Sequence, residues 1–139
     1  MRLFDDWGYA VRVILFQDRF AGKVRDGSKP HTIRKTARCK PGDVLSLRRW
    51  TGKPYRSTQE TLRTETCLSV EPVRVSNDGV SVGGRWVDAE QIAIADGFVD
   101  FGEMMLWFGI THGLPCDGFL IRWSNNTGER PETRSERTA

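Results

Sequence analysis

The sequence predicts an α+β domain with a mostly antiparallel, curved sheet. Short β-branched runs outnumber helical stretches, the two clearest helices follow one another near the C-terminus, and a hairpin turn joins two strands. Runs of strands with clustered helices are typical of α+β domains, whereas a doubly wound fold alternates strands with helices. A chain of 139 residues is long enough for one such domain.

The N-terminal part is predicted to form a strand and then a helix. Residues 11–16 are apolar except for Arg12 and include three β-branched residues, as in a mostly buried strand. Phe16, Phe20 and Val24 then recur every four residues with charged residues between them, which is the spacing of one apolar helix face. Gly27 is a suitable residue to end that helix.

An extended piece, a turn and a strand are expected next. Residues 31–35 are extended, and a Lys-Pro-Gly-Asp turn follows at 40–43. The strand after the turn alternates, with Leu45 and Leu47 on one face. A polar loop occupies 51–60.

Residues 61–76 are predicted to form one long strand with a returning partner. Leu68 and Val70 are its expected apolar anchors, and Pro72 indicates an edge or a bulge. The Asn-Asp-Gly sequence at 77–79 is typical of a hairpin turn, so a strand should return immediately after it.

Two helices and a closing strand complete the predicted domain. Asp88 with Gln91, and Asp100 with Glu103, have the spacing of capping boxes at two helix starts. The second helix carries an apolar stripe at i, i+3, i+4 and i+7, formed by Phe101, Met104, Met105 and Phe108. We interpret this stripe as core packing rather than as a cofactor site. The last strand is expected at 119–123.

One domain over residues 1–124 and a disordered tail over 125–139 are expected, because the tail has no large apolar residue. The chain has an odd number of cysteines, and no two of them form a CxxC pair: Cys39, Cys67 and Cys116. This favours free thiols in a reducing compartment. The sequence shows no signal peptide and no apolar run of membrane length. We therefore expect a cytoplasmic protein without a membrane partner.

Positive charge is concentrated in one window of the chain. Residues 29–56 contain nine basic residues and one acid, so the window carries +8, while the net charge of the whole chain is only +3. Such asymmetry is the electrostatic footprint expected for phosphates or another polyanion.

The residues after the first helix resemble a known family. Gly27, then Lys-x-x-Thr-Ile-Arg at 29–34, then a Gly-Asp turn leading into a strand, resembles the ASCH domains of the PUA-like superfamily. The Ala-Asp-Gly-Phe sequence at 95–98 and the closing strand at 118–123 are also similar to those of ASCH proteins from bacteria and phages. The resemblance covers residues 11–123. It implies a small, curved, PUA-like β-barrel with flanking helices and a cleft beside the first helix.

The resemblance also implies a function class. PUA-like domains bind RNA or modified bases, and one ASCH branch, the acetylcytidine amidohydrolases, removes an acetyl group from a base nitrogen. That branch uses a Lys and a Thr in Lys-x-x-Thr spacing, together with a Glu near the later helices. Lys29 and Thr32 match the spacing, and Asp96 lies where the Glu is expected, with a shorter side chain. The resemblance therefore implies catalytic roles for Lys29, Thr32 and Asp96.

Physical arguments support this trio and also leave an alternative. Residues three apart in an extended segment point to opposite faces, so Lys29 and Thr32 share a site only if Pro30 bends the chain. A desolvated Lys can lose its proton and activate a Thr hydroxyl. Asp96 ends a predicted helix, where a negative charge is unfavourable unless a cation such as Lys29 offsets it. The alternative is a solvated Lys29, an ordinary strand residue at Thr32 and an Asp-Gly turn.

Seven further residues are predicted to bind ligand or nucleic acid: Arg34, Lys35, Arg38, Arg48, Arg49, Trp50 and Tyr55. Guanidinium groups and aromatic faces together suit phosphates and stacked bases. Arg34, Arg48 and Arg49 are expected to line the barrel mouth, with the two aromatic residues interleaved. The alternative is a solvated basic face with Trp50 in the core.

Several functions stay open at this point. The first is a module that binds RNA, single-stranded nucleic acid or a modified nucleobase or nucleoside. The second is an amidohydrolase acting on N-acylated cytidine, the third is an ASCH-type ribonuclease, and a protein-interaction role is a further alternative. His31 and His112 are expected to be structural or surface residues, and no Cys, His or carboxylate set has metal-binding spacing. We expect neither a metal nor a cofactor.

Overall fold

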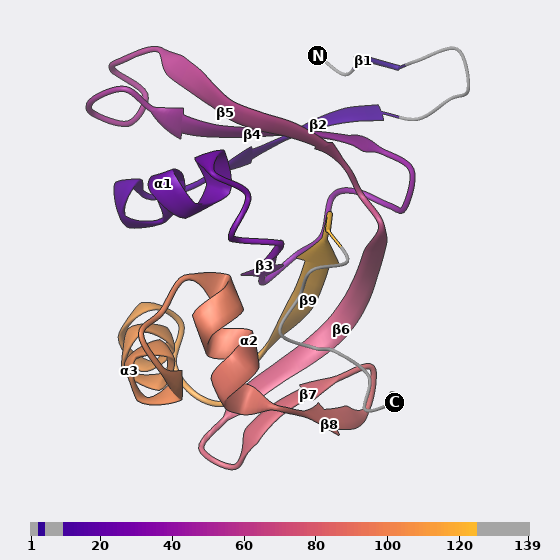
Figure 1. Cartoon of the computed structure of the whole chain (residues 1–139), viewed down its shortest axis with the longest axis vertical. Coiled ribbons are helices and arrows are strands. Elements are labelled where there is room, and N and C mark those ends of the chain that lie inside the picture. The colour runs from indigo at the N-terminus through magenta and orange to yellow at the C-terminus, as the bar shows by residue number, and fades with distance from the viewer. Residues whose placement is uncertain (1–2, 5–9, 125–139) are drawn as a thin grey trace.

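The computed structural model describes residues 3–4 and 10–124, which contain nine strands and three helices (Figure 1). The strands form two sheets in which nearly all neighbouring pairs are antiparallel. The expected α+β class is therefore confirmed. The predicted tail at 125–139 lies outside the described residues.

The first sheet has the order β1-β2-β4-β5, formed by β1 (Leu3–Phe4), β2 (Ala10–Leu15), β4 (Val44–Trp50) and β5 (Gln59–Thr66). The β2–β4 pair is parallel, and its register places Val11 opposite Val44. A bulge between Leu47 and Arg48 shifts the register of β4 against β5. In this sheet Leu45 and Leu47 are fully buried, as their alternation predicted.

The second sheet has the order β3-β9-β6-β7-β8. Its strands are β3 (His31–Arg34), β9 (Cys116–Arg122), β6 (Ser69–Ser76), β7 (Gly79–Val82) and β8 (Arg85–Val87). All pairs in this sheet are antiparallel, and the predicted hairpin joins β6 to β7. The short strand β8 was not predicted from the sequence.

The prediction of one strand over residues 61–76 is wrong. The backbone of Cys67 exchanges hydrogen bonds with Gly42 and Asp43 of the first sheet's turn, at 2.8 Å each. The next N–H, that of Leu68, donates to the carbonyl of Arg122 in the second sheet at 2.7 Å. The chain therefore changes sheets here, and Leu68 is 43% exposed instead of anchoring the core. Two separate sheets result, and no closed barrel is seen among the described strands (Figure 1).

Three helices flank the sheets: α1 (Asp18–Arg25), α2 (Ala89–Asp96) and α3 (Phe101–Thr111). Both predicted N-caps are confirmed, because the side chain of Asp88 accepts the N–H of Gln91 and that of Asp100 accepts the N–H of Glu103. Helix α2 and helix α3 lie side by side next to the second sheet, while α1 lies against the first sheet (Figure 1).

The buried apolar side chains form one continuous cluster between the helices and the two sheets. Phe20 and Val24 extend it from α1, and Met104 and Phe108 extend it from α3, as the predicted stripes require. None of the helices in the described part of the chain combines the length and the apolar character that a membrane span requires. Cys39, Cys67 and Cys116 carry free thiols.

Candidate functional site

A cavity of about 230 Å³ lies where α1, β3 and the turn between α2 and α3 meet. Its polar wall includes all three residues of the predicted trio, Lys29, Thr32 and Asp96. Its apolar wall is mainly aromatic and includes Phe16, Phe20, Phe98, Trp107 and Phe108. We call this cavity the aromatic pocket.

The loop that leaves α1 explains how Lys29 reaches the same pocket as Thr32. Gly27 adopts φ +85°, and the backbone N–H of Lys29 returns to the carbonyl of Lys23 at 3.0 Å. The carbonyl of Pro30 accepts the N–H of Trp123 at 3.0 Å, which fixes the entry into β3. Lys29 therefore precedes the extended segment, and the alternation rule for strands does not separate it from Thr32.

The ammonium group of Lys29 is held at the C-terminus of α2. Its Nζ donates to Asp96 Oδ1 and to the Asp96 carbonyl oxygen, both at 2.6 Å. The Lys29 side chain is 2% exposed and that of Asp96 is 6% exposed. The predicted pairing is thus confirmed, and the ammonium offsets both the carboxylate and the negative end of the helix dipole.

Burial shifts both members of this pair toward their neutral forms. Desolvation lowers the pKa of Lys29 although Asp96 acts in the opposite direction, and Arg34 and Arg19 lower it further. Desolvation likewise raises the pKa of Asp96, against the effect of Lys29 and Arg34. A buried amine whose pKa falls is better able to accept a proton near neutral pH.

His31 lies behind the pair and was not predicted as part of the site. Its Nε2 is 3.4 Å from Asp96 Oδ1, and neither ring nitrogen has a hydrogen-bond partner in the described structure. Burial, followed by the charges of Lys29 and Arg122, holds the pKa of His31 well below its ordinary value. Burial therefore favours the neutral form of the His31 imidazole next to the Asp96 carboxyl group.

Arg34, one of the predicted binding residues, links Thr32 to the end of β2. The Nε of Arg34 donates to Thr32 Oγ1 at 3.2 Å, and its Nη2 donates to the carbonyl of Leu15 at 2.8 Å. The guanidinium carbon lies 4.9 Å from the centre of the Phe16 ring, within cation–π range. The Arg34 contact therefore places a positive charge next to the Thr32 hydroxyl oxygen.

The aromatic wall comes from two helices, α1 and α3, and from the segments that precede each of them. Phe20 meets Phe98 edge to face at 5.5 Å and Trp107 at 6.0 Å between ring centres. Lys29 Nζ lies 5.0 Å from the centre of the Phe20 ring. His112, at the end of α3, also lines the pocket and packs 5.7 Å from Trp107.

The turn after α2 depends on a glycine. Gly97 has φ +110° and ends the helix in the left-handed conformation. A Cβ atom at this position would lie 2.9 Å from Cδ1 of Phe20. Both the turn that presents Asp96 and the close approach of α1 therefore require glycine at residue 97.

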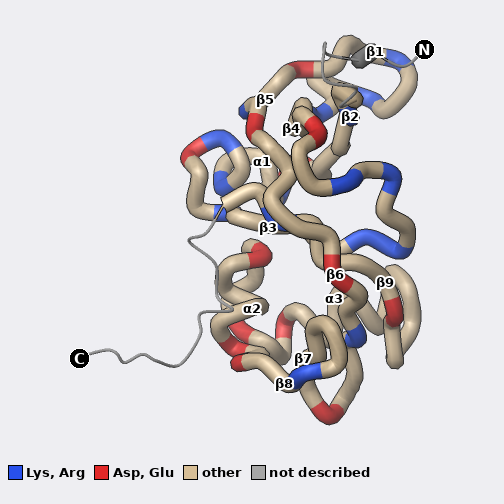
Figure 2. Tube along the Cα trace, turned by 90° about the vertical axis from the view of Figure 1, so that its right-hand side faces the viewer, with Lys and Arg blue, Asp and Glu red and all other residues tan. Residues whose placement is uncertain are grey.

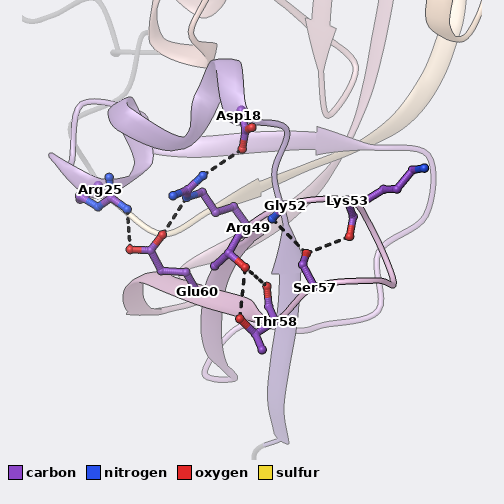
Figure 3. Close-up of polar contacts among 9 residues, drawn as sticks. Asp18, Arg25, Arg49, Gly52, Lys53, Ser57, Thr58 and Glu60 are labelled. Atoms are coloured by element: carbon purple, nitrogen blue, oxygen red, sulfur yellow. Dashed lines mark hydrogen bonds and ion pairs between the residues drawn. The ribbon is translucent and has the colours of Figure 1, made fainter.

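Four predicted binding residues do not line the aromatic pocket: Arg48, Arg49, Trp50 and Tyr55. Arg49 donates to Glu60 at 2.8 Å and to Asp18 at 3.2 Å, and Arg25 also contacts Glu60 (Figure 3). Arg48 donates to Ser46 and Gln59. The prediction that Arg48 and Arg49 line the same opening as Arg34 is wrong. Partners on β4 and β5 hold Arg48, and partners on β5 and α1 hold Arg49.

The two predicted aromatic binding residues form a pair on the polar loop. The rings of Trp50 and Tyr55 lie 5.1 Å apart, and Tyr55 is 87% exposed with φ 64°. Trp50 borders a neighbouring hollow with Pro54, and Leu15, Phe16 and Gln17 line both this hollow and the aromatic pocket. It is half-buried, so the alternative of a core tryptophan does not describe it.

The remaining two predicted binding residues follow Arg34 in the chain. Lys35 lines the aromatic pocket, and both Lys35 and Arg38 line a neighbouring cavity. In the part of the chain that the structure describes, no set of three His, Cys, Asp or Glu side chains is placed to hold a metal ion.

Sequence reasoning missed most of the aromatic wall. Trp107 lies three residues after Met104 on α3, beside the buried stripe, and this helical position was a usable signal. Phe98 follows the Asp-Gly pair directly and was part of the recognised sequence pattern. Nothing in the local sequence indicated that His31 would be buried against Asp96, since the contact joins segments 65 positions apart.

The chain was compared with protein-family models, with curated proteins and with solved structures, and no match was found in any of the three comparisons.

Proposed function

We propose that this chain is an ASCH-like domain that binds a nucleobase or nucleoside in the aromatic pocket. The observation that carries the proposal is the convergence of Lys29, Thr32 and Asp96 on one cavity with an aromatic wall. Planar bases stack on aromatic side chains, and directional polar groups read their edges. The position of the pocket beside α1 also supports the PUA-like arrangement that the sequence resemblance implies.

The size and charge of the pocket favour a single nucleoside over a nucleic-acid strand. Its volume of about 230 Å³ is below the roughly 300–1,000 Å³ typical of sites for drug-sized ligands. The basic residues that were expected to form one surface lie in different places, since Arg34 and Lys35 line the pocket and Arg49 does not. Arg49 instead donates hydrogen bonds to Asp18 and Glu60. Strand binding through Arg48, Arg49, Trp50 and Tyr55 therefore has less support than binding of one base.

Calorimetric titration with cytidine, uridine, adenosine and guanosine tests this function. Thr32→Val removes the pocket hydroxyl at nearly constant shape and should weaken the best nucleoside by about tenfold, which corresponds to one lost hydrogen bond. Thr61→Val on exposed β5 is the matched control and should leave affinity unchanged. Absence of binding by all four nucleosides and by N4-acetylcytidine would reject the proposal.

The Lys29–Asp96 pair favours a second candidate function, hydrolysis of an N-acylated pyrimidine nucleoside. The shorter Asp96 reaches Lys29 at 2.6 Å, so its length does not prevent the pairing that the resemblance implies. Burial favours the neutral amine of Lys29 by lowering its pKa. Arg34 donates to Thr32 Oγ1, and a cation at this oxygen stabilises an alkoxide.

The proposed reaction uses only groups on this wall. Lys29, as the neutral amine, takes the proton of Thr32 Oγ1, and the oxygen attacks the acyl carbonyl. The C–N bond breaks, the base leaves as a free amine with the proton from Lys29, and the acyl group stays on Thr32 as an ester. Water then hydrolyses the ester and releases a carboxylic acid. Asp96 orients the Lys29 amine throughout.

Release of acetate and cytidine from N4-acetylcytidine, followed by mass spectrometry, tests this chemistry. Thr32→Val and Lys29→Met should each abolish turnover, while Thr61→Val should retain it. Thr32→Val should also prevent formation of an acyl-enzyme with a mass increase of one acetyl group. A wild-type protein that binds N4-acetylcytidine without turning it over would reject hydrolysis and retain binding.

A further inference from the structure

A second cavity adjoins the aromatic pocket and has a different character. It has a volume of about 560 Å³ and lies between β2 and the connection from β3 to β4. Four cationic side chains line it, and its lining residues include no Asp or Glu: Arg12, Arg34, Lys35 and Arg38. Figure 2 shows Lys and Arg positions recurring along the β3–β4 connection, on the right of the view. We call this the basic cavity.

The cations of the basic cavity are poorly neutralised by the described residues. Lys35 and Arg38 are exposed and form no hydrogen bond or ion pair with a residue that the structure describes. Arg34 donates hydrogen bonds from Nε to Thr32 and from Nη2 to Leu15, and its Nη1 has no described acceptor. Unpaired cations around one hollow create a positive potential that favours an anion.

Arg12 strengthens this argument because it is partly buried and incompletely paired. Its Nε forms a long ion pair with Asp43 Oδ2, at 3.7 Å, and has no hydrogen-bond partner in the described structure. Asp43 is already occupied by Lys40 at 3.0 Å and by the N–H of Ala10 at 3.1 Å. Arg49, in the basic window at residues 29–56, by contrast has two carboxylate partners.

The two cavities are contiguous. Leu15, Arg34 and Lys35 line both of them, so the Arg34 guanidinium forms part of the wall between them. A ligand whose planar part lies in the aromatic pocket can therefore place an attached anionic group in the basic cavity without crossing the core. A nucleotide carries its phosphate at this kind of position, one sugar away from the base.

We propose that the basic cavity binds the phosphate group of a nucleotide whose base occupies the aromatic pocket. The proposal rests on the proposed function and narrows its ligand from a nucleoside to a phosphorylated nucleoside. Arg12, Arg34, Lys35 and Arg38 supply the positive charge, and guanidinium groups bind phosphate oxygens through paired N–H donors. The phosphate belongs either to a free nucleotide or to an RNA chain.

Binding of the four common ribonucleosides and of their 5′-monophosphates, measured by calorimetry at one low salt concentration, tests this site. We expect the phosphate to raise affinity at least tenfold. Arg38→Gln should remove most of that gain and leave nucleoside affinity unchanged. Arg56→Gln, which changes an exposed arginine of the 51–58 loop, is the matched control and should keep the gain. A gain of equal size in the Arg38→Gln variant would overturn the proposal.

Inorganic phosphate, titrated while backbone NMR signals are followed, separates this proposal from the function on which it rests. Shifts at residues 34–38 that vanish in Arg38→Gln, without binding of any nucleoside or nucleotide, would retain the anion site and reject nucleobase binding. Nucleoside binding without any effect of phosphate would retain nucleobase binding and overturn the anion site. Tighter binding of a monophosphate than of a dinucleotide identifies a free nucleotide, and the reverse order identifies RNA.

Discussion

Lys29 Nζ contacts Asp96 Oδ1 at 2.6 Å while both side chains are almost fully buried. Removing two charges from water costs several kcal/mol each, and their mutual attraction offsets that cost only while both are present. Each charged side chain is therefore tolerated in the interior only while its partner is present. Each partner is needed mainly because the other one is there.

We predict that Asp96→Asn destabilises the protein by about 3–5 kcal/mol, because it leaves the buried Lys29 without a counter-charge. Lys29→Met should cost a similar amount for the converse reason. The double variant, which lacks both charges, should lose less than the sum of the two single variants. Urea denaturation of the four proteins measures this coupling.

An exposed ion pair provides the control. Arg74 and Asp117 contact each other at 3.2 Å, with side chains that are 53% and 68% exposed. Asp117→Asn should change stability by at most about 1 kcal/mol. Additive effects of the Lys29 and Asp96 substitutions would contradict the view that the pair acts as a unit.

The buried His31 makes stability depend on pH. Its pKa in the folded protein lies well below the ordinary value of 6.5 because of burial. The unfolded chain therefore takes up a proton near pH 6.5 that the folded protein does not, so stability falls as pH is lowered through this value. The slope for one proton is at most about 1.4 kcal/mol per pH unit.

His31→Gln should remove this slope, and the difference in unfolding free energy between wild type and variant, measured from pH 7.5 to 5, is the test. Asp96 has a raised pKa and contributes in the opposite direction, but it is present in both proteins. The exposed His112, whose pKa is also lowered, serves as control, and His112→Gln should alter the slope less. Equal slopes in wild type and His31→Gln would contradict the prediction, because they would show that folding does not shift the pKa of His31.

The local elements were largely predictable because their signals are local. The caps at Asp88 and Asp100 and the hairpin at residues 77–79 depend on residues a few positions apart, and all three are confirmed. The change of sheet at Cys67 and Leu68 was not predictable, because it rests on hydrogen bonds to Gly42 and Arg122 from distant segments.

The candidate site was likewise predictable only in part. Lys29, Thr32 and Asp96 were predicted to converge because of the sequence resemblance and because Asp96 needs a cation at a helix end. Charge density alone grouped Arg49 with Arg34, yet the sequence cannot show that Asp18 and Glu60 neutralise Arg49 in the fold. Sequence-based charge windows therefore overestimate the continuous basic surface of this protein.

We predict that Arg49→Ala leaves nucleoside affinity unchanged, whereas Arg34→Ala weakens it at least tenfold. Arg49 contacts Asp18 and Glu60 outside the aromatic pocket, while Arg34 lines the pocket and donates to Thr32. Calorimetry with the best nucleoside ligand compares the two variants directly. A similar loss of affinity in both would mean that the ligand extends along β4 toward the polar loop.

Gly118 offers a test of how β9 positions the site. A Cβ atom at this residue would lie 2.5 Å from the carbonyl oxygen of Arg34 and 3.1 Å from its carbonyl carbon. Backbone atoms cannot rotate away as a side chain can, so Gly118→Ala must displace β3 at the point where it presents Arg34. We expect a loss of about 1–3 kcal/mol, the usual cost of overpacking.

The matched substitution is Gly22→Ala, since a Cβ atom on this α1 residue meets nothing within 4 Å. It should be neutral or should stabilise the protein by up to about 1 kcal/mol, because alanine favours the helix. Thermal unfolding of both variants, together with nucleoside titration, completes the comparison. Gly118→Ala should lower both stability and affinity, since it moves Arg34, while Gly22→Ala should preserve affinity. A Gly118→Ala protein with wild-type affinity would show that the ligand does not depend on the position of Arg34.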